Sequence, residues 1–198
     1  MISWKEAAVA LEIPDTKLLL LIKLGVILPI VSRNKGPILF GPKEIDRAKH
    51  AIADMTFLAT VQPGNWDLLK QEKLSFTAFP ESPKGWHEVL RSGNRILFYV
   101  TRLGAVAGLA SVTGKVRREP FSTGSTTYPL RVRLKPEIIL DPTSAVKIKP
   151  LRERLSFIKN PKNWSNYVKF SLTPVSRQDF NLIHGHMTAN LAAQSTTQ

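Results

Sequence analysis

The hydrophobic period of this chain changes near Met55, and this change limits the chain to a fold with two dissimilar parts. Before Met55, apolar residues recur at helical spacing, as Ile45, Ala48 and Ile52 do. After it, apolar residues form short runs or alternate with polar ones, as in strands. The mixture of short strands with helices predicts an α+β protein built on a small barrel.

The first part predicts a compact helical unit. Ser3 and Glu6 have the spacing of a capping box, and Gly25 is a typical residue just past the end of a helix. In chain order, we expect helices that begin at Ser3, at Asp15 and at Pro42, with a short hairpin or wing over residues 26–40.

The second part predicts a barrel closed by a helix. The segments RILFYV and AVAGLASV flank a short turn at residues 102–104, so we expect them to pair as a hairpin. Ser176 and Asp179 have capping-box spacing before a final helix. The predicted domains are residues 1–53, residues 54–186 and a flexible tail over residues 187–198.

The chain carries a large excess of positive charge, with 28 Lys and Arg residues against 15 Asp and Glu and a net charge of +13. Residues 51–198 hold 20 of the basic and 10 of the acidic residues. Neutralising phosphates releases condensed counterions, so this excess favours a polyanionic partner. We therefore expect a nucleic acid.

Several classes of chemistry are excluded by the residues at hand. The chain has no cysteine, which removes disulfides, thiolate nucleophiles and cysteine-ligated metals. Its longest apolar run, residues 18–22, is too short to span a bilayer, and the N-terminus reads as a capped helix rather than a secretion leader. Motifs of common hydrolases and nucleotide-binding enzymes are missing. We expect a cytoplasmic protein that is not an enzyme, with no metal or cofactor and no membrane partner.

Ordered motifs in the second part resemble those of EVE domains. They are GNWDLLKQ, GNRILFYVT with AVAGLASVTGKV, YPLRVRLKP, KPLRERLSFIKNPKNW and VSRQDFNLI, which together cover nearly all of residues 55–186. The resemblance implies a PUA-like β-barrel with flanking helices that binds nucleic acid. It further implies that a modified base, expected in DNA, is flipped out of its stack into an aromatic pocket.

The resemblance also implies candidate site residues. A base pocket is expected to draw on Phe57, Phe76, Trp86, Tyr99, Thr101, Trp164 and Ser165, and phosphate contacts on Arg117, Arg118, Arg131, Arg133, Lys159 and Lys162. For the strand aromatics, packing in the core is the competing interpretation. For the alternating basic residues Arg131, Arg133 and Lys135, the competing interpretation is a solvated strand face.

Residues 1–52 resemble the small winged-helix modules of MerR and excisionase proteins, on the segments SWKEAAVALEIPDTKLLLLIKLGVILPI and ILFGPKEIDRAK. The resemblance implies that the second helix enters a DNA groove. Leu20 and Leu24 depart from it, because they cannot read the hydrogen-bonding pattern of bases and instead suggest a homodimer or another protein contact. Candidate phosphate contacts here are Lys17, Lys23, Arg33 and Lys35.

Three other functions fit the sequence besides a reader of modified DNA bases. In a transcription-type regulator, the winged helix reads a DNA sequence and the barrel senses a small ligand. PUA-like barrels also serve RNA, so an RNA-binding protein is a further alternative. A protein-interaction module that uses Leu20 and Leu24 is the third.

Overall fold

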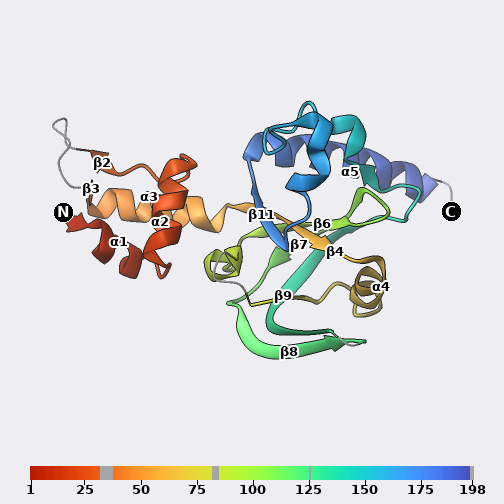
Figure 1. The fold of residues 1–198 in the computed structure, drawn as a ribbon, viewed down its shortest axis with the longest axis horizontal. Coiled ribbons are helices and arrows are strands. Elements are labelled where there is room, and N and C mark those ends of the chain that lie inside the picture. The colour runs from red at the N-terminus through yellow and green to blue at the C-terminus, as the bar shows by residue number, and fades with distance from the viewer. Residues whose placement is uncertain (32–37, 82–84, 125, 197–198) are drawn as a thin grey trace. The chain divides into compact units, whose positions relative to one another are not determined.

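The computed structural model describes residues 1–31, 38–81, 85–124 and 126–196 (Figure 1). The chain divides into two compact units, Met1–Asp54 and Met55–Gln198. Each unit buries an apolar core of its own, with Leu11, Leu18 and Phe40 in the first and Leu58 and Leu97 in the second.

The first unit combines three helices with a three-stranded antiparallel sheet in the order β1-β3-β2. The predicted capping box at the start of the first helix is confirmed, since Ser3 N donates to Glu6 Oε2 at 2.7 Å and Glu6 N donates to Ser3 Oγ at 3.4 Å. The elements are β1 (Ile2–Ser3), α1 (Trp4–Ala10), α2 (Asp15–Lys23), β2 (Ile30–Val31), β3 (Ile38–Phe40) and α3 (Pro42–Ala53).

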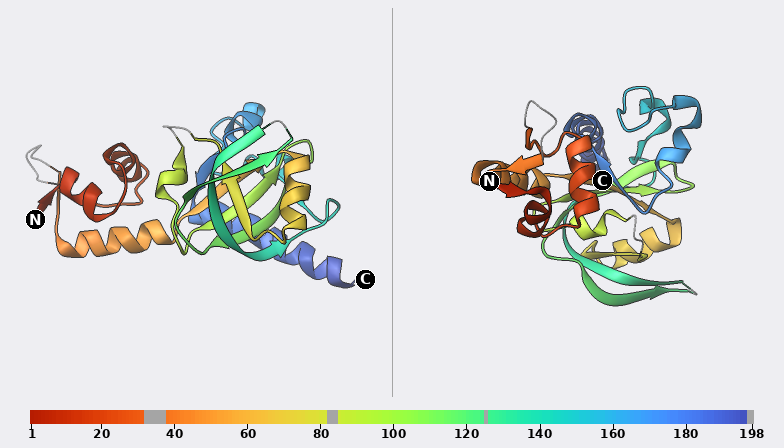
Figure 2. Two further views of the ribbon diagram at one scale, coloured as in Figure 1. Left: turned by 90° about the horizontal axis from the view of Figure 1, so that it is seen from below. Right: turned by 60° about the vertical axis from the view of Figure 1, so that its left-hand side comes forward.

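The second unit is built on a curled sheet with the strand order β11-β4-β6-β7-β9-β5. Strands β4 and β6 pair in parallel, and the other described pairs are antiparallel. Figure 2 shows how the sheet curls into an open barrel. Its strands are β4 (Thr56–Val61), β5 (Phe76–Phe79), β6 (Arg95–Val100), β7 (Ala105–Val112), β8 (Arg117–Thr123), β9 (Thr126–Ile139), β10 (Val146–Lys147) and β11 (Leu172–Val175). Its helices are α4 (Pro63–Gln71), α5 (Arg177–Thr196) and the 3-10 segments η1 (Trp86–Val89), η2 (Lys149–Leu151) and η3 (Pro161–Tyr167).

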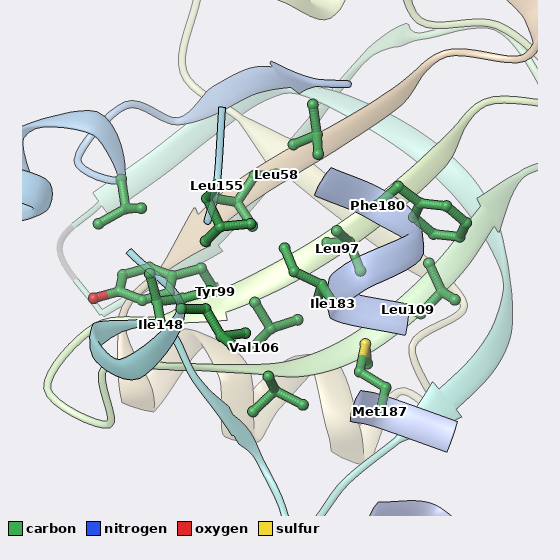
Figure 3. Packing of buried hydrophobic residues seen from close by; sticks show 14 of the residues in the cluster. Leu58, Leu97, Tyr99, Val106, Leu109, Ile148, Leu155, Phe180, Ile183 and Met187 are labelled. Atoms are coloured by element: carbon green, nitrogen blue, oxygen red, sulfur yellow. The ribbon is translucent and has the colours of Figure 1, made fainter. Parts of the chain in front are cut away.

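Strands β6 and β7 pair as the hairpin that the sequence predicts, and this hairpin is covered on both faces. On one face, α5 presents Phe180, Ile183 and Met187 to strand residues that include Leu97 and Leu109 (Figure 3). On the other face, the Trp66 ring of α4 lies 5.7 Å from the Phe98 ring. A Cβ at Gly108 would come within 2.4 Å of Trp66, so only glycine allows this close approach. Both faces of the central strands are therefore apolar.

Helix α5 extends through residues 187–196, which the sequence suggested would be a flexible tail. Met187 is fully buried, and Leu191 packs against the same core. Further along the helix, Asn190 Nδ2 donates to the Ser144 carbonyl at 2.7 Å, and Gln194 Oε1 accepts from Asp141 N at 3.1 Å. These contacts with the loop after β9 hold the helix where the small polar residues alone suggested fraying.

Candidate functional site

A pocket opens between the end of β4, the first turn of α4, strand β5 and the β8–β9 hairpin. Its volume is about 240 Å³. Aromatic, amide and hydroxyl groups line it together with one lysine, and no carboxylate takes part among the described residues. The lining residues are Ala59, Thr60, Val61, Gln62, Asn65, Leu69, Thr77, Ala78, Phe79, Pro80, Phe121, Tyr128, Lys169 and Ser171.

Two aromatic residues on the β8–β9 hairpin form one wall of the pocket. Phe121 and Tyr128 are cross-strand partners, so their side chains lie on the same face of the hairpin. The pairing register shifts between Arg118 and Phe121, and such a bulge re-aims the side chain that follows it. Phe121 and Tyr128 are both half-buried, which leaves ring surface open to a ligand. We call Phe121 and Tyr128 the aromatic wall.

Hydrogen bonds orient the polar groups of the pocket. Asn65 Nδ2 donates to Tyr128 Oη at 3.0 Å, which leaves the Asn65 carbonyl oxygen and the Tyr128 hydroxyl proton for other partners. Thr101 Oγ1 donates to Gln62 Oε1 at 2.8 Å. This bond turns the Gln62 oxygen toward Thr101, so the Gln62 Nε2 donor group points away from Thr101. The pocket therefore offers both donors and an acceptor, as the edge of a base requires.

A basic segment adjoins the pocket. Thr60 Oγ1 donates to the Val168 carbonyl at 2.6 Å, and this bond joins the end of β4 to the residues that precede β11. Lys169 follows Val168 and lines the pocket. Residues 147–169 contain seven Lys or Arg residues and a single acidic residue, Glu153. This basic segment thus ends at Lys169, in the lining of the pocket.

The structure places the seven predicted pocket residues elsewhere: of the described residues that line this pocket, none belongs to that set. Phe57 and Tyr99 are core residues, with 0% and 6% of their surface exposed. The physical reason is that both faces of the central strands are covered, so alternate side chains on either face are buried. Tyr99 lies in the core that α5 closes (Figure 3), and Trp164 of η3 packs against the same core beside the exposed Ser165.

Three other predicted pocket residues differ in their surroundings. The Phe76 ring lies 4.9 Å from the Phe121 ring, edge to face, so Phe76 supports the aromatic wall. Thr101 contacts two lining residues, since Thr101 Oγ1 donates to Gln62 Oε1 and Thr101 N donates to the Val61 carbonyl at 2.9 Å. Trp86 is half-buried, with its ring 6.2 Å from the Phe57 ring.

The predicted phosphate contacts fall into several environments. Arg118 forms an ion pair with Glu81, and Arg131 Nη1 lies 2.6 Å from Glu119 Oε1. The side chains of Arg117, Arg133, Lys159, Lys162 and Lys23 are exposed. Arg33 and Lys35 lie outside the described residues.

Lys17 differs from the prediction, which placed it on the exposed face of α2. Its side chain is only 5% exposed. Lys17 and the fully buried Leu21 are four residues apart and so share the buried face of the helix. Leu20 and Leu24 are exposed as predicted, at 36% and 51%.

The pocket residues that the sequence interpretation missed carried two signals. Asn65 stands directly before Trp66, within the segment GNWDLLKQ that resembles EVE domains, and Gln62 lies two residues before that segment begins. Phe121 and Tyr128 flank a run of Ser, Thr and Gly, which is a hairpin signal, and equal spacing from a turn places two aromatics on one face.

The described ranges contain neither a metal-binding cluster nor a membrane-spanning helix. No group of three or more His, Asp or Glu side chains comes together there in a way that could hold a metal ion. None of the helices in these ranges has the length and apolar character needed to cross a membrane.

Comparison with known proteins identifies the second unit. The EVE domain model matches residues 55–186. A UPF0310 protein of Pyrococcus abyssi is 30% identical over 142 residues, which is 64% of this chain and 95% of that protein. A UPF0310 protein of Pyrococcus horikoshii is 26% identical over 60% of this chain and 89% of its own length.

The fold has counterparts among solved structures. The NMR structure of Rpa0253 from Rhodopseudomonas palustris aligns with a TM-score of 0.50 and 15% identity, over 68% of this chain and 94% of that one. The α+β fold with a PUA-like barrel and flanking helices, predicted from the sequence, is thus confirmed. With the motifs in order and the family match over residues 55–186, this chain belongs to the EVE domain family.

Proposed function

We propose that the second unit binds nucleic acid and takes one modified base, flipped out of a DNA strand, into the pocket beside Phe121 and Tyr128. The observation that carries this proposal is the combination of an aromatic wall with oriented amide groups next to a basic segment. The EVE family membership supports it, as does the charge of the chain.

The size of the pocket suits a single base. Pockets for drug-sized ligands measure roughly 300–1,000 Å³, and this one measures about 240 Å³. Extruding a base costs a few kcal/mol, and stacking on an aromatic side chain returns about 1–3 kcal/mol. Hydrogen bonds from Gln62, Asn65 and Tyr128 to the base edge would supply the remainder.

Selectivity for a modification follows from apolar contact. A single extra methyl group in a close-fitting pocket is worth about 1–3 kcal/mol, which corresponds to roughly tens-fold in affinity. Binding of the backbone by Lys169 and the exposed basic residues is independent of the base and weakens with salt. A reader of this design therefore shows strong salt dependence together with a moderate base preference.

Fluorescence anisotropy with matched duplexes tests the proposal. The duplexes carry cytosine, 5-methylcytosine, 5-hydroxymethylcytosine or N6-methyladenine at one position, at two salt concentrations. We expect a preference of roughly tens-fold for one modification that survives the higher salt. Phe121→Ala should reduce that preference by about tenfold, since it removes a stacking surface.

A matched control is Phe170→Ala, because Phe170 is an exposed aromatic beside Lys169 that does not line the pocket. Its variant should keep the wild-type preference. Equal affinities for all duplexes in the wild-type protein would contradict the proposal. Tighter binding of RNA than of DNA with the same sequence would favour the RNA-binding alternative.

A further inference from the structure

Arg131 occupies an environment unlike that of Arg133, the other arginine on β9. Its guanidinium carbon lies 4.2 Å from the centre of the Phe76 ring and 5.4 Å from that of the Phe121 ring. Its Nη1 atom bonds Glu119 Oε1 at 2.6 Å. Its Nε atom is buried and has no hydrogen-bond partner within the described part of the chain. The side chain is thus committed to internal contacts.

These contacts converge on the back of the aromatic wall. Phe76 meets Phe121 edge to face at 4.9 Å, and Arg131 covers both rings. A guanidinium packs well on an aromatic face, because its planar charge is weakly hydrated and attracted to the ring. Phe121 lines the pocket, whereas Phe76 and Arg131 do not. Phe121 therefore has Arg131 and Phe76 behind it and open pocket in front.

The Arg131–Glu119 ion pair also ties the two strands together at an irregular point. Glu119 lies in the bulge where the β8–β9 register shifts, just before Phe121. The residues from Arg117 to Pro120 are exposed, so this part of β8 has little apolar burial to hold it in place. The contacts of Glu119 and Phe121 with Arg131 therefore add to the strand pairing on either side of the bulge and anchor it to β9.

We propose that Arg131 is a positioning residue of the pocket: through Glu119, Phe76 and Phe121 it holds the aromatic wall at the distance that a modified base requires. The proposal rests on the proposed function of the same pocket. It assigns to Arg131 a role in selectivity rather than the phosphate contact that the sequence suggested. Modified and unmodified bases differ by a few atoms, so a small displacement of Phe121 erases the difference between them.

Three variants separate the two roles. Arg131→Met removes the charge and keeps an unbranched apolar chain against the rings, while Glu119→Gln removes only the anion. Arg133→Met is the matched control, because Arg133 is an exposed arginine two residues away on the same face of β9. The binding measurement is the ratio of affinities for the modified and the unmodified duplex, at two salt concentrations.

If Arg131 positions the aromatic wall, Arg131→Met and Glu119→Gln lower this ratio about tenfold. Arg133→Met lowers the affinity for both duplexes equally and leaves the ratio unchanged. If Arg131 contacts phosphate, Glu119→Gln frees its charge and strengthens binding to both duplexes alike. An unchanged ratio in Arg131→Met and Glu119→Gln overturns the proposal. Thermal unfolding verifies that each variant is folded, and Glu119→Gln carries the test if Arg131→Met is not.

A second measurement needs no nucleic acid. We expect amide hydrogen exchange over residues 117–123 to rise at least severalfold in Arg131→Met and Glu119→Gln but not in Arg133→Met, with exchange in β6 and β7 unchanged. Unchanged exchange in the hairpin would overturn the positioning role even if binding were affected. A wild-type protein without any base preference would instead refute the proposed function, and the exchange data would then decide only whether Arg131 supports the hairpin.

Discussion

At the scale of single residues, Tyr99 shows how its surroundings determine the chemistry of a side chain. Tyr99 lies on strand β6 with only 6% of its surface exposed. The core that α5 completes encloses its side chain. Burial raises the pKa of the Tyr99 phenol above its ordinary value near 10, because the phenolate would lose its hydration. The neutral phenol is therefore favoured in the folded state.

This shift predicts an alkaline weakness of the fold. The folded-state pKa of Tyr99 is raised, so its contribution to stability is fully present below about pH 10 and is lost as pH rises through the folded pKa. The Tyr99→Phe variant has no phenol to ionise at this position. Its free energy of unfolding should therefore fall less between about pH 8 and about pH 11 than that of the wild-type protein. Urea unfolding at both pH values measures the difference. Parallel losses in the two proteins would show that Tyr99 plays no part.

The same residues explain what the sequence could and could not predict about the site. Phe57 and Tyr99 lie on strands with a helix or loop over each face, and an aromatic in a pocket has the same sequence pattern as one in a core. Gln62 and Asn65 were missed because their roles depend on bonds to distant residues, Thr101 and Tyr128. Charge and family motifs predicted a nucleic-acid partner without locating the pocket.

At the scale of elements, the attachment of α5 depends on the buried residue Asp179 as well as on apolar contacts. Ser176 Oγ accepts from Asp179 N at 3.1 Å, which is half of the predicted capping box. The Asp179 carboxylate instead accepts from Ser156 N at 2.7 Å, from Ser156 Oγ at 2.6 Å and from Phe157 N at 3.2 Å. One fully buried side chain thus fixes the helix start to the loop before η3.

Asp179→Ala should lower the free energy of unfolding by about 3 kcal/mol, because it leaves buried donors without an acceptor. Ser176→Ala is the matched control, since it removes the N-terminal cap and a 3.2 Å contact with Ser156 Oγ but keeps the carboxylate, and it should cost about 1 kcal/mol. Urea unfolding followed by tryptophan fluorescence reports both values. Equal losses would mean that the carboxylate acts only as part of the cap.

At the scale of the whole molecule, the two units differ in surface character. Basic residues do not distinguish them, because residues 51–198 make up 148 of the 198 residues and hold 20 of the 28 basic ones. The first unit instead exposes large apolar side chains, including Leu20, Leu24 and Leu28, the last at 75%. Leucines cannot read base edges, and exposed apolar groups of this size are typical of protein contacts. We propose, as the sequence suggested, that Leu20 and Leu24 form a protein contact, and a second copy of this chain is the partner that can be tested directly.

This division predicts separable effects on mass and on binding. In light scattering, the wild-type protein should show about twice the 22.1 kDa mass of one chain. The double variant Leu20→Asp, Leu24→Asp should return to the mass of a single chain, because a carboxylate at a buried contact is costly. Its affinity for a short duplex, counted per chain, should stay within about twofold. A wild-type protein that is already monomeric rules out the dimer.

The position of β4 in the sheet sets the order in which the barrel can form. β4 lies between β6, about forty residues later, and β11, whose Thr173 pairs with Leu58. Partners so distant along the chain give a high contact order, and such topologies fold slowly. During synthesis, β4 must leave the ribosome well before its last neighbour exists, with Phe57 and Leu58 still uncovered. Early chaperone binding at this strand is the expected consequence for the growing polypeptide.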